Sequence, residues 1–259
     1  MRKRDLLYPT LLFAIFILFI TEGDRLFGYV PEPRNNCART EEIMESPEYE
    51  YISRYVHLSH YDSYFREAAD SIGLDWTFLA AIAHTESRFD STAVSVSGAK
   101  GVMQMMPGTL RAFGVPDSLH ADNRHNIHAS ARYIKELFRI FRFIKNPEER
   151  LNFVLASYNA GHSHIYDAIR IAGKCGFKKD VWKGNVDSCL TLKSLPEYYN
   201  DSTLCRYGRL RDWKQTHAFV KNVTRTWSRF NTRQQEYMDS VNTIIANDTL
   251  KRLDVKHRR

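Results

Sequence analysis

Apolar residues recur at the spacing of an α-helix over most of this chain, and this periodicity limits the fold more than any other feature of the sequence. Runs that alternate apolar and polar residues, as a half-buried strand does, are scarce. The chain is therefore predicted to be mostly α. Helices are expected over residues 64–72, 76–88, 107–113, 127–145, 147–158, 165–172 and 216–230, with an amphipathic C-terminal helix over 234–253.

The N-terminus has the order of a targeting sequence. Arg2, Lys3 and Arg4 precede an almost wholly apolar run at 6–20, as a basic region precedes the apolar core of a secretory signal. The run is shorter than the roughly 20 residues that span a bilayer, yet no small-residue cleavage site follows it. Residues 1–22 are thus predicted to be a signal peptide or a membrane anchor, and a buried core helix is the alternative.

The net charge of +7 is concentrated at the two ends of the chain. Residues 1–5 carry +2 and residues 251–259 carry +4, so only +1 is left for everything between them. A high isoelectric point that arises from two tails indicates no basic groove. No nucleic-acid partner is expected.

The length of 259 residues suits one large domain, and two domains are the alternative. Residues 23–50 are rich in Pro and Glu and are predicted to be a linker. The folded domain is expected over 51–233, followed by a helical basic tail over 234–259.

Four cysteines form an even set without the C-x-x-C spacing of a zinc site, which in an exported chain favours disulfides. The candidates are Cys37, Cys175, Cys189 and Cys205. Three pairings are open, and at least one bridge is expected among the last three, within a long loop over 173–206.

Glu86 is the candidate catalytic residue. Asp75 is a predicted N-cap, and Phe78, Ile82 and Glu86 follow at i, i+4 and i+8 on one helix face. A carboxyl group at the end of an apolar stripe is expected to have a raised pKa, because burial disfavours the charged form, and it can then act as a general acid near neutral pH. The alternative is a glutamate that turns to solvent at the helix end.

The segment that Glu86 opens, ESRFDSTAVSVSGAKGVMQMMPGT at 86–109, closely resembles the signature of the soluble lytic transglycosylase family. ASYNAG at 156–161 is similar to the family's second motif. The run YGRLRDWKQTHAFVKNV at 207–223 resembles the third conserved segment of the membrane-bound branch. The first motif is highly specific, whereas ASYNAG alone would be weak.

The resemblance implies a lysozyme-like fold of the α+β lysozyme superfamily, mostly α, with a groove for a glycan strand. It assigns the catalytic acid to Glu86 and implies no metal or other cofactor. The residues that it assigns to substrate binding are Ser87, Gly101, Met103, Gln104, Met105, Tyr158 and Asn159.

Several of these assignments have a physical reason. Gly101 lets the loop backbone approach a sugar, and Gln104 offers an amide to N-acetyl groups. Met103, Met105 and Met106 can form an adaptable apolar wall, although simple core packing is the alternative for Met103 and Met106.

The activity that the resemblance implies is cleavage of the MurNAc–GlcNAc β-1,4 bond of peptidoglycan with 1,6-anhydro-MurNAc ends. Glu86 would protonate the glycosidic oxygen, the 2-acetamido group would stabilise C1, and Glu86 would then take the proton of the C6 hydroxyl. Peptidoglycan strands are the expected partner of a monomer in the periplasm or cell envelope, held to a membrane through its N-terminal segment.

Two other functions stay open. A hydrolytic muramidase on the same fold would use water in place of the C6 hydroxyl, and most such enzymes need a second carboxylate. A non-catalytic peptidoglycan-binding protein would have no use for Glu86. His162 and His164 are a poor metal signal without further ligands.

Aromatic residues in and beside the cysteine-containing loop are candidates for stacking on sugars, and packing is their alternative role. They are Trp182, Tyr198, Tyr199 and Tyr207.

Overall fold

The computed structural model describes residues 56–257, which form nine α-helices and no extended strand, so the prediction of a mostly α protein is confirmed. The helices are α3 (Asp62–Ile72), α4 (Trp76–Ser87), α5 (Pro107–Ala112), α6 (Asn123–Ile140), α7 (Pro147–Ala160), α8 (His162–Lys174), α9 (Asp187–Leu192), α10 (Pro196–Tyr199) and α11 (Trp213–His257). A 3₁₀ turn, η2 (Asp117–Leu119), and a π turn, η3 (Trp182–Val186), complete the regular elements.

Polar N-caps fix where three of the central helices begin. The Asp75 carboxylate accepts a hydrogen bond from Thr77 N at 2.8 Å before α4, and Asn146 accepts one from Glu149 N at 3.1 Å before α7. Asp122 caps α6 by accepting from His125 N at 2.8 Å. Because of this cap α6 begins at Asn123, four residues before the predicted start, and it ends at Ile140 rather than at 145.

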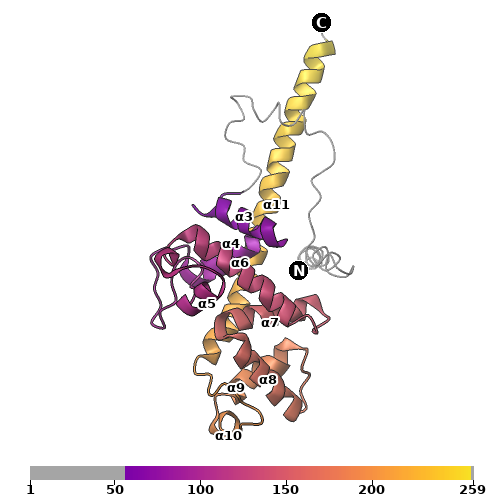
Figure 1. Ribbon diagram of the computed structural model, residues 1–259. Coiled ribbons are helices and arrows are strands. Elements are labelled where there is room, and N and C mark those ends of the chain that lie inside the picture. Colours follow the sequence, from indigo (N-terminus) through magenta and orange to yellow (C-terminus); the bar gives the residue numbers. More distant parts are fainter. Residues whose placement is uncertain (1–55, 258–259) are drawn as a thin grey trace.

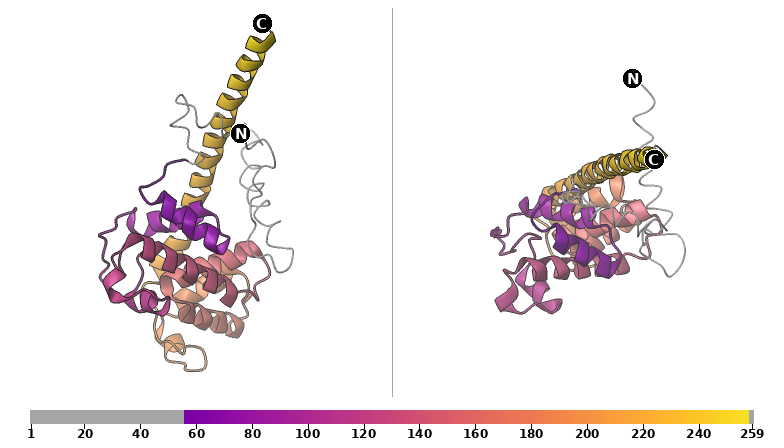
Figure 2. Two further views of the ribbon diagram at one scale, coloured as in Figure 1. Left: turned by 45° about the horizontal axis from the view of Figure 1, so that its top comes forward. Right: turned by 90° about the horizontal axis from the view of Figure 1, so that it is seen from above.

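The long helix α11 runs along the body and packs mainly against α4 and α7, while α3 packs against α4 and α6. Figure 1 shows α8, α9 and α10 at one end of the body and the C-terminal part of α11 extending beyond the other end. The left view of Figure 2 shows the same protrusion. The helix passes without a break through the domain boundary that was expected near residue 233.

The contact between α4 and α11 is centred on Trp227. Its indole ring meets Phe78 edge to face at 5.2 Å between ring centres, and its Nε1 donates to the Asp75 carboxylate at 2.8 Å. The residue that caps α4 thus also holds α11, so the start of the helix that carries Glu86 is fixed against α11.

The far end of the body is held by a buried ion pair between Lys193 and Asp167, both with fully buried side chains. Asp167 also accepts hydrogen bonds from the backbone N–H groups of Arg206 and Tyr207, each at 3.1 Å. Lys193 donates to Gly208 O at 2.6 Å. This cluster ties the 205–208 segment to α8 and to the C-cap of α9.

Within the described residues the expected disulfide is not formed, because Cys175, Cys189 and Cys205 are free thiols. The predicted long loop over 173–206 is also wrong, since this stretch contains η3, α9 and α10. Cys175 is exposed beside the Tyr198 hydroxyl, whereas Cys189 and Cys205 are buried. Burial raises the pKa of the Cys189 thiol to about 12. The loop is therefore closed by the Lys193–Asp167 cluster instead of by a disulfide.

The predicted export segment at 1–22, the linker at 23–50 and Cys37 lie outside the described residues. Within 56–257, no helix combines the length and the apolar character that crossing a membrane requires.

Candidate active site

Glu86 lies in the last turn of α4, one residue before the helix ends. Arg88 and Phe89 follow with φ values of 56° and 68°, a left-handed conformation that L-residues seldom adopt. The Phe89 ring packs against Phe65 at 6.1 Å and His84 at 5.5 Å, so core contacts hold this turn. The chain consequently leaves the helix axis directly after Ser87, one residue beyond Glu86.

The Glu86 carboxyl group is half-buried, and burial raises its pKa from 4.5 to about 8. Desolvation is the cause, since the charged form loses hydration. The group is therefore protonated at neutral pH and has the state that a general acid requires.

Asp90, the next carboxylate along the chain, has a different environment. It is exposed, and its Oδ1 accepts hydrogen bonds from the backbone N and the hydroxyl of Thr92 at 2.8 and 2.7 Å. These bonds lower the pKa of Asp90, so it stays ionised. The two carboxyl groups thus differ in charge at neutral pH, and Asp90 braces the turn that follows Glu86.

The loop after this turn is fastened to α4 through Ser87, whose hydroxyl donates to Val102 O at 2.8 Å. Gln104 has a φ of 47°, and its Nε2 donates to Ala93 O and Gly101 O, both at 2.9 Å. The amide nitrogen of Gln104 is thus used within the loop and braces it.

Asn126 of α6 is a residue of this site that the sequence analysis missed. It is buried, its Oδ1 accepts from Met103 N at 3.0 Å, and its Nδ2 donates to Lys100 O at 3.1 Å. Gly101 has a φ of 76°, and a Cβ there would lie 3.2 Å from the Asn126 amide. Asn126 thus holds the loop at the point where only glycine fits.

Tyr158 of α7 joins the second motif to the first. Its hydroxyl donates to Met103 O at 2.8 Å, and burial raises its pKa well above the ordinary value, with the negative charge of Glu86 as a further cause. Met103 and Met105 are buried, whereas Met106 is 44% exposed. Met103 therefore packs in the core, and its backbone carbonyl is what meets Tyr158.

The third motif, at 207–223, contributes residues of α11 that contact Tyr158 and Asn159. Thr216 donates to the Asn159 amide oxygen at 3.0 Å, and the Phe219 ring stacks on Tyr158 at 6.1 Å. The three motifs, which are more than 40 residues apart in sequence, are thus in contact around Tyr158 and Asn159.

In the part of the chain that the structure describes, no group of three or more His, Cys, Asp or Glu residues is arranged to hold a metal ion. Trp182 is buried against Phe153, while Tyr207 is 54% exposed and lies at the Lys193–Asp167 cluster.

Residues 63–181 match the family described as "Transglycosylase SLT domain". A membrane-bound lytic murein transglycosylase F of Desulfosudis oleivorans is 38% identical over 157 residues, which are 61% of this chain and 33% of that protein. The protein of the same name from Alcanivorax borkumensis is 31% identical over 227 residues, 85% of this chain and 44% of its own.

Among solved structures, an inactive mutant of the lytic transglycosylase Slt from Pseudomonas aeruginosa aligns with 22% identity and a TM-score of 0.44, over 71% of this chain and 24% of that one. The chain spans about a third of the length of the curated relatives it matches first. Residues 63–181 are therefore similar to a transglycosylase SLT domain, the family that the sequence motifs indicate for this part of the chain.

Proposed function

We propose that this chain is an exported peptidoglycan lytic transglycosylase that cleaves the MurNAc–GlcNAc β-1,4 bond and leaves 1,6-anhydro-MurNAc ends. The relatives named above are membrane-bound lytic murein transglycosylases, and residues 63–181 match the SLT domain. The observation that carries the proposal is the half-buried Glu86, with a pKa raised to about 8.

Glu86 performs both proton transfers in this proposal. Its protonated carboxyl group donates to the glycosidic oxygen as the bond to C1 breaks. The 2-acetamido oxygen of MurNAc closes on C1 and stabilises the positive charge. Glu86, now ionised, accepts the proton of the C6 hydroxyl, whose oxygen attacks C1 and releases the acetamido group.

A single carboxyl group suffices for this route, because the substrate supplies the nucleophile that a second carboxylate provides in most glycosidases. The exposed, ionised Asp90 is engaged by Thr92, which suits a structural role. This arrangement supports the transglycosylase over a hydrolytic muramidase.

The surroundings of Glu86 have a positioning role in this proposal. Asn126, Ser87 and Tyr158 each fix the backbone between Lys100 and Met103, and a rigid support is what a reacting group needs. We further propose that the helices adopt a lysozyme-like arrangement and that the protein acts in the cell envelope.

The experiment is a mass spectrum of the products from purified peptidoglycan. A transglycosylase releases anhydro-muropeptides, and a muramidase releases products heavier by one water. Glu86→Gln run in parallel identifies any contaminating activity. Binding without products would leave a non-catalytic peptidoglycan-binding protein, and hydrated products alone would overturn the proposal.

A further inference from the structure

The C-terminal part of α11, residues 234–257, extends beyond the helical body, and one side of it is less exposed than the rest (Figure 1). On that side Gln234, Tyr237 and Ile245 are half-buried. Val241 is only 6% exposed. The four positions follow at i, i+3, i+7 and i+11, a spacing that places them on one face of the helix. We call them the α11 stripe.

The stripe is buried although the hydrophobic core does not reach it. Ile244, directly beside it in sequence, is 44% exposed, and Thr243 is exposed as well. Within residues 56–257 the core includes buried residues of α11 only as far as Phe230, so it does not contain Val241. A buried valine in a protruding helix needs a cover other than this core. The stripe is therefore a surface that suits a further segment of chain.

The described part of the chain begins at the foot of the stripe. Val56 N donates to the Gln234 side-chain oxygen Oε1 at 3.0 Å, and Val56 itself is buried. The residues immediately before Val56 are thereby tethered beside α11. Extended chain covers about 3.3 Å per residue and an α-helix about 1.5 Å. Residues 51–55 are thus long enough to follow the stripe as far as Ile245, and 45–55 to reach the end of the helix.

The sequence before Val56 complements what α11 offers. Residues 51–55, YISRY, carry two tyrosines and an isoleucine that suit an apolar stripe. Residues 41–50 contain five glutamates and no lysine or arginine, whereas residues 251–259 carry a net charge of +4. If 51–55 follow the stripe, the acidic residues come to lie beside the basic end of α11. Opposite charges at this position attract each other, so charge and apolar pattern favour the same placement.

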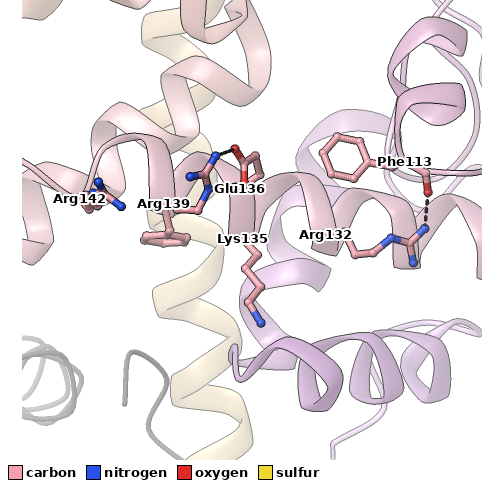
Figure 3. Close-up of a pocket in the computed structure, with 7 residues that line it drawn as sticks. Phe113, Arg132, Lys135, Glu136, Arg139 and Arg142 are labelled. Atoms are coloured by element: carbon pink, nitrogen blue, oxygen red, sulfur yellow. Dashed lines mark hydrogen bonds and ion pairs between the residues drawn. The ribbon is translucent and has the colours of Figure 1, made fainter. Parts of the chain in front are cut away.

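The outer face of α6 is a second basic surface. Its cations, which Figure 3 shows in order along the helix and the following turn, are Arg132, Lys135, Arg139 and Arg142. Two of them are engaged nearby, since Arg139 pairs with Glu136 at 2.7 Å and Arg132 donates to Phe113 O at 2.8 Å. The stripe on α11, in contrast, starts at the residue that binds Val56. Continuity of the chain thus favours α11.

We propose that residues 41–55 pack lengthwise on the C-terminal part of α11, with 51–55 on the stripe and the glutamates of 41–50 beside its basic end. Only 23–40 then remain as a linker, and the export segment predicted at 1–22 joins the domain at the tip of α11. The 23 helical steps from 234 to 257 span about 35 Å. The helix, and not a flexible tether, would thus set the distance between the body and a membrane. This inference is independent of the reaction proposed for Glu86.

Zero-length cross-linking tests this placement in the full chain. A carbodiimide joins a glutamate carboxylate to a lysine amine as an amide and takes up the water that is lost, and mass spectrometry identifies the pair. Cross-links from 41–50 to Lys251 or Lys256 within one chain are expected. Their absence, or cross-links to Lys135 in their place, overturns the proposal. In a mixture of unlabelled and isotopically labelled chains, cross-links that join the two kinds would assign the stripe to a second copy and overturn it as well.

Two matched variants test the stripe by limited proteolysis. Val241→Asp places a charge in the covered face and should release 51–55. Trypsin should then cleave after Arg54 at least about tenfold faster, because cleavage follows the population of the released segment. Ile244→Asp, at the exposed neighbour, should leave this rate unchanged. Cleavage after Arg150, which is buried in α7, reports unfolding of the domain and should not change. An unchanged rate at Arg54 in Val241→Asp, or an equal rise at both sites, contradicts the proposal.

Discussion

The hydroxyl group of Tyr158 donates a hydrogen bond of 2.8 Å to the backbone carbonyl oxygen of Met103 and so joins α7 to the loop that follows Glu86. Both residues are buried, and Phe219 of α11 stacks on the Tyr158 ring. A buried carbonyl needs a partner, so this bond constrains the loop more than a surface bond would.

Tyr158→Phe removes the hydroxyl and keeps the ring. We expect the free energy of unfolding to fall by about 1–3 kcal/mol, because Met103 O is left buried without this donor. Turnover should fall as well, since the loop beside Glu86 loses a restraint. Chemical denaturation and initial rates on peptidoglycan measure the two effects. Tyr207→Phe, at an exposed ring, is the matched control, and equal effects from both variants would contradict the prediction.

Glu86→Gln keeps the shape of the side chain and removes the transferable proton. Positioned acid–base groups contribute about 10²–10⁴-fold, and turnover of the variant should fall by at least this factor. Glycan binding and the circular dichroism spectrum should be retained. The control is Glu148→Gln, at an exposed glutamate in the first turn of α7. A variant that still solubilises peptidoglycan at the rate of the wild type would remove Glu86 from the mechanism.

The pKa of Glu86 predicts two pH dependences. Activity that needs the protonated acid should decline as the pH rises through about 8. The pH dependence of stability also follows from the raised pKa. Between pH 4.5 and about pH 8 the folded state holds a proton that the unfolded state has released, so the free energy of unfolding falls as the pH rises.

Glu86→Gln has no such proton, and the stability difference between the variant and the wild type isolates this group. The variant should gain stability relative to the wild type from pH 4.5 to 8, and the difference should level off above 8. Denaturation curves at pH 4, 6, 8 and 9 test this sign. A difference that stays constant over this range would show that the carboxyl group titrates normally.

The spacing of apolar residues was enough to predict where most helices lie, because an amphipathic helix face depends on the local sequence alone. It also placed Glu86 at the end of an apolar stripe. The exact ends of the helices could not be predicted as well, because they depend on capping residues. The Asp122 cap places the start of α6 four residues before the predicted one, and two left-handed residues end α4 at Ser87. The role of Asn126 could not be predicted, because a buried asparagine in a helix has no local pattern.

Residues 173–206, which were predicted to be a long loop and instead contain η3, α9 and α10, show a second limit of the sequence prediction. Cysteine count and compartment favoured a disulfide, yet this part of the chain is closed by Lys193 and Asp167. From the sequence alone, a lysine and an aspartate 26 residues apart are both expected on the solvent-exposed surface, since such residues are rarely fully buried. Only the packing of α8 against α9 brings them together.

Gly101→Ala tests the contact between the loop and α6. Alanine at a φ of 76° is strained by about 1 kcal/mol, and its Cβ would also press on Asn126 at 3.2 Å. Gly98→Ala, at a φ of 85°, has the same strain and meets nothing within 4 Å. We expect Gly101→Ala to lower stability and turnover more than Gly98→Ala does. Equal losses, measured by thermal unfolding and initial rates, would show that the Asn126 contact is not limiting.

Lys193→Met removes one of two cations that pair with the buried Asp167 and leaves the partly exposed Arg170 to offset its charge. Loss of one partner from a buried ion pair costs up to about 3–5 kcal/mol, and hydrogen exchange at the Arg206 and Tyr207 amides should accelerate because both donate to Asp167. Lys183→Met, at an exposed lysine, is the control and should change neither quantity.

A double variant separates charge from packing at this cluster. Asp167→Asn in the Lys193→Met background removes the buried carboxylate charge and leaves the partly exposed Arg170 to solvent, while the asparagine oxygen still accepts from a backbone N–H group. Part of the lost stability should therefore return, and protection of the two amides should recover with it. If the double variant is less stable than Lys193→Met alone, burial of the Asp167 charge is not the cause of the loss, and the cluster stabilises the loop through packing alone.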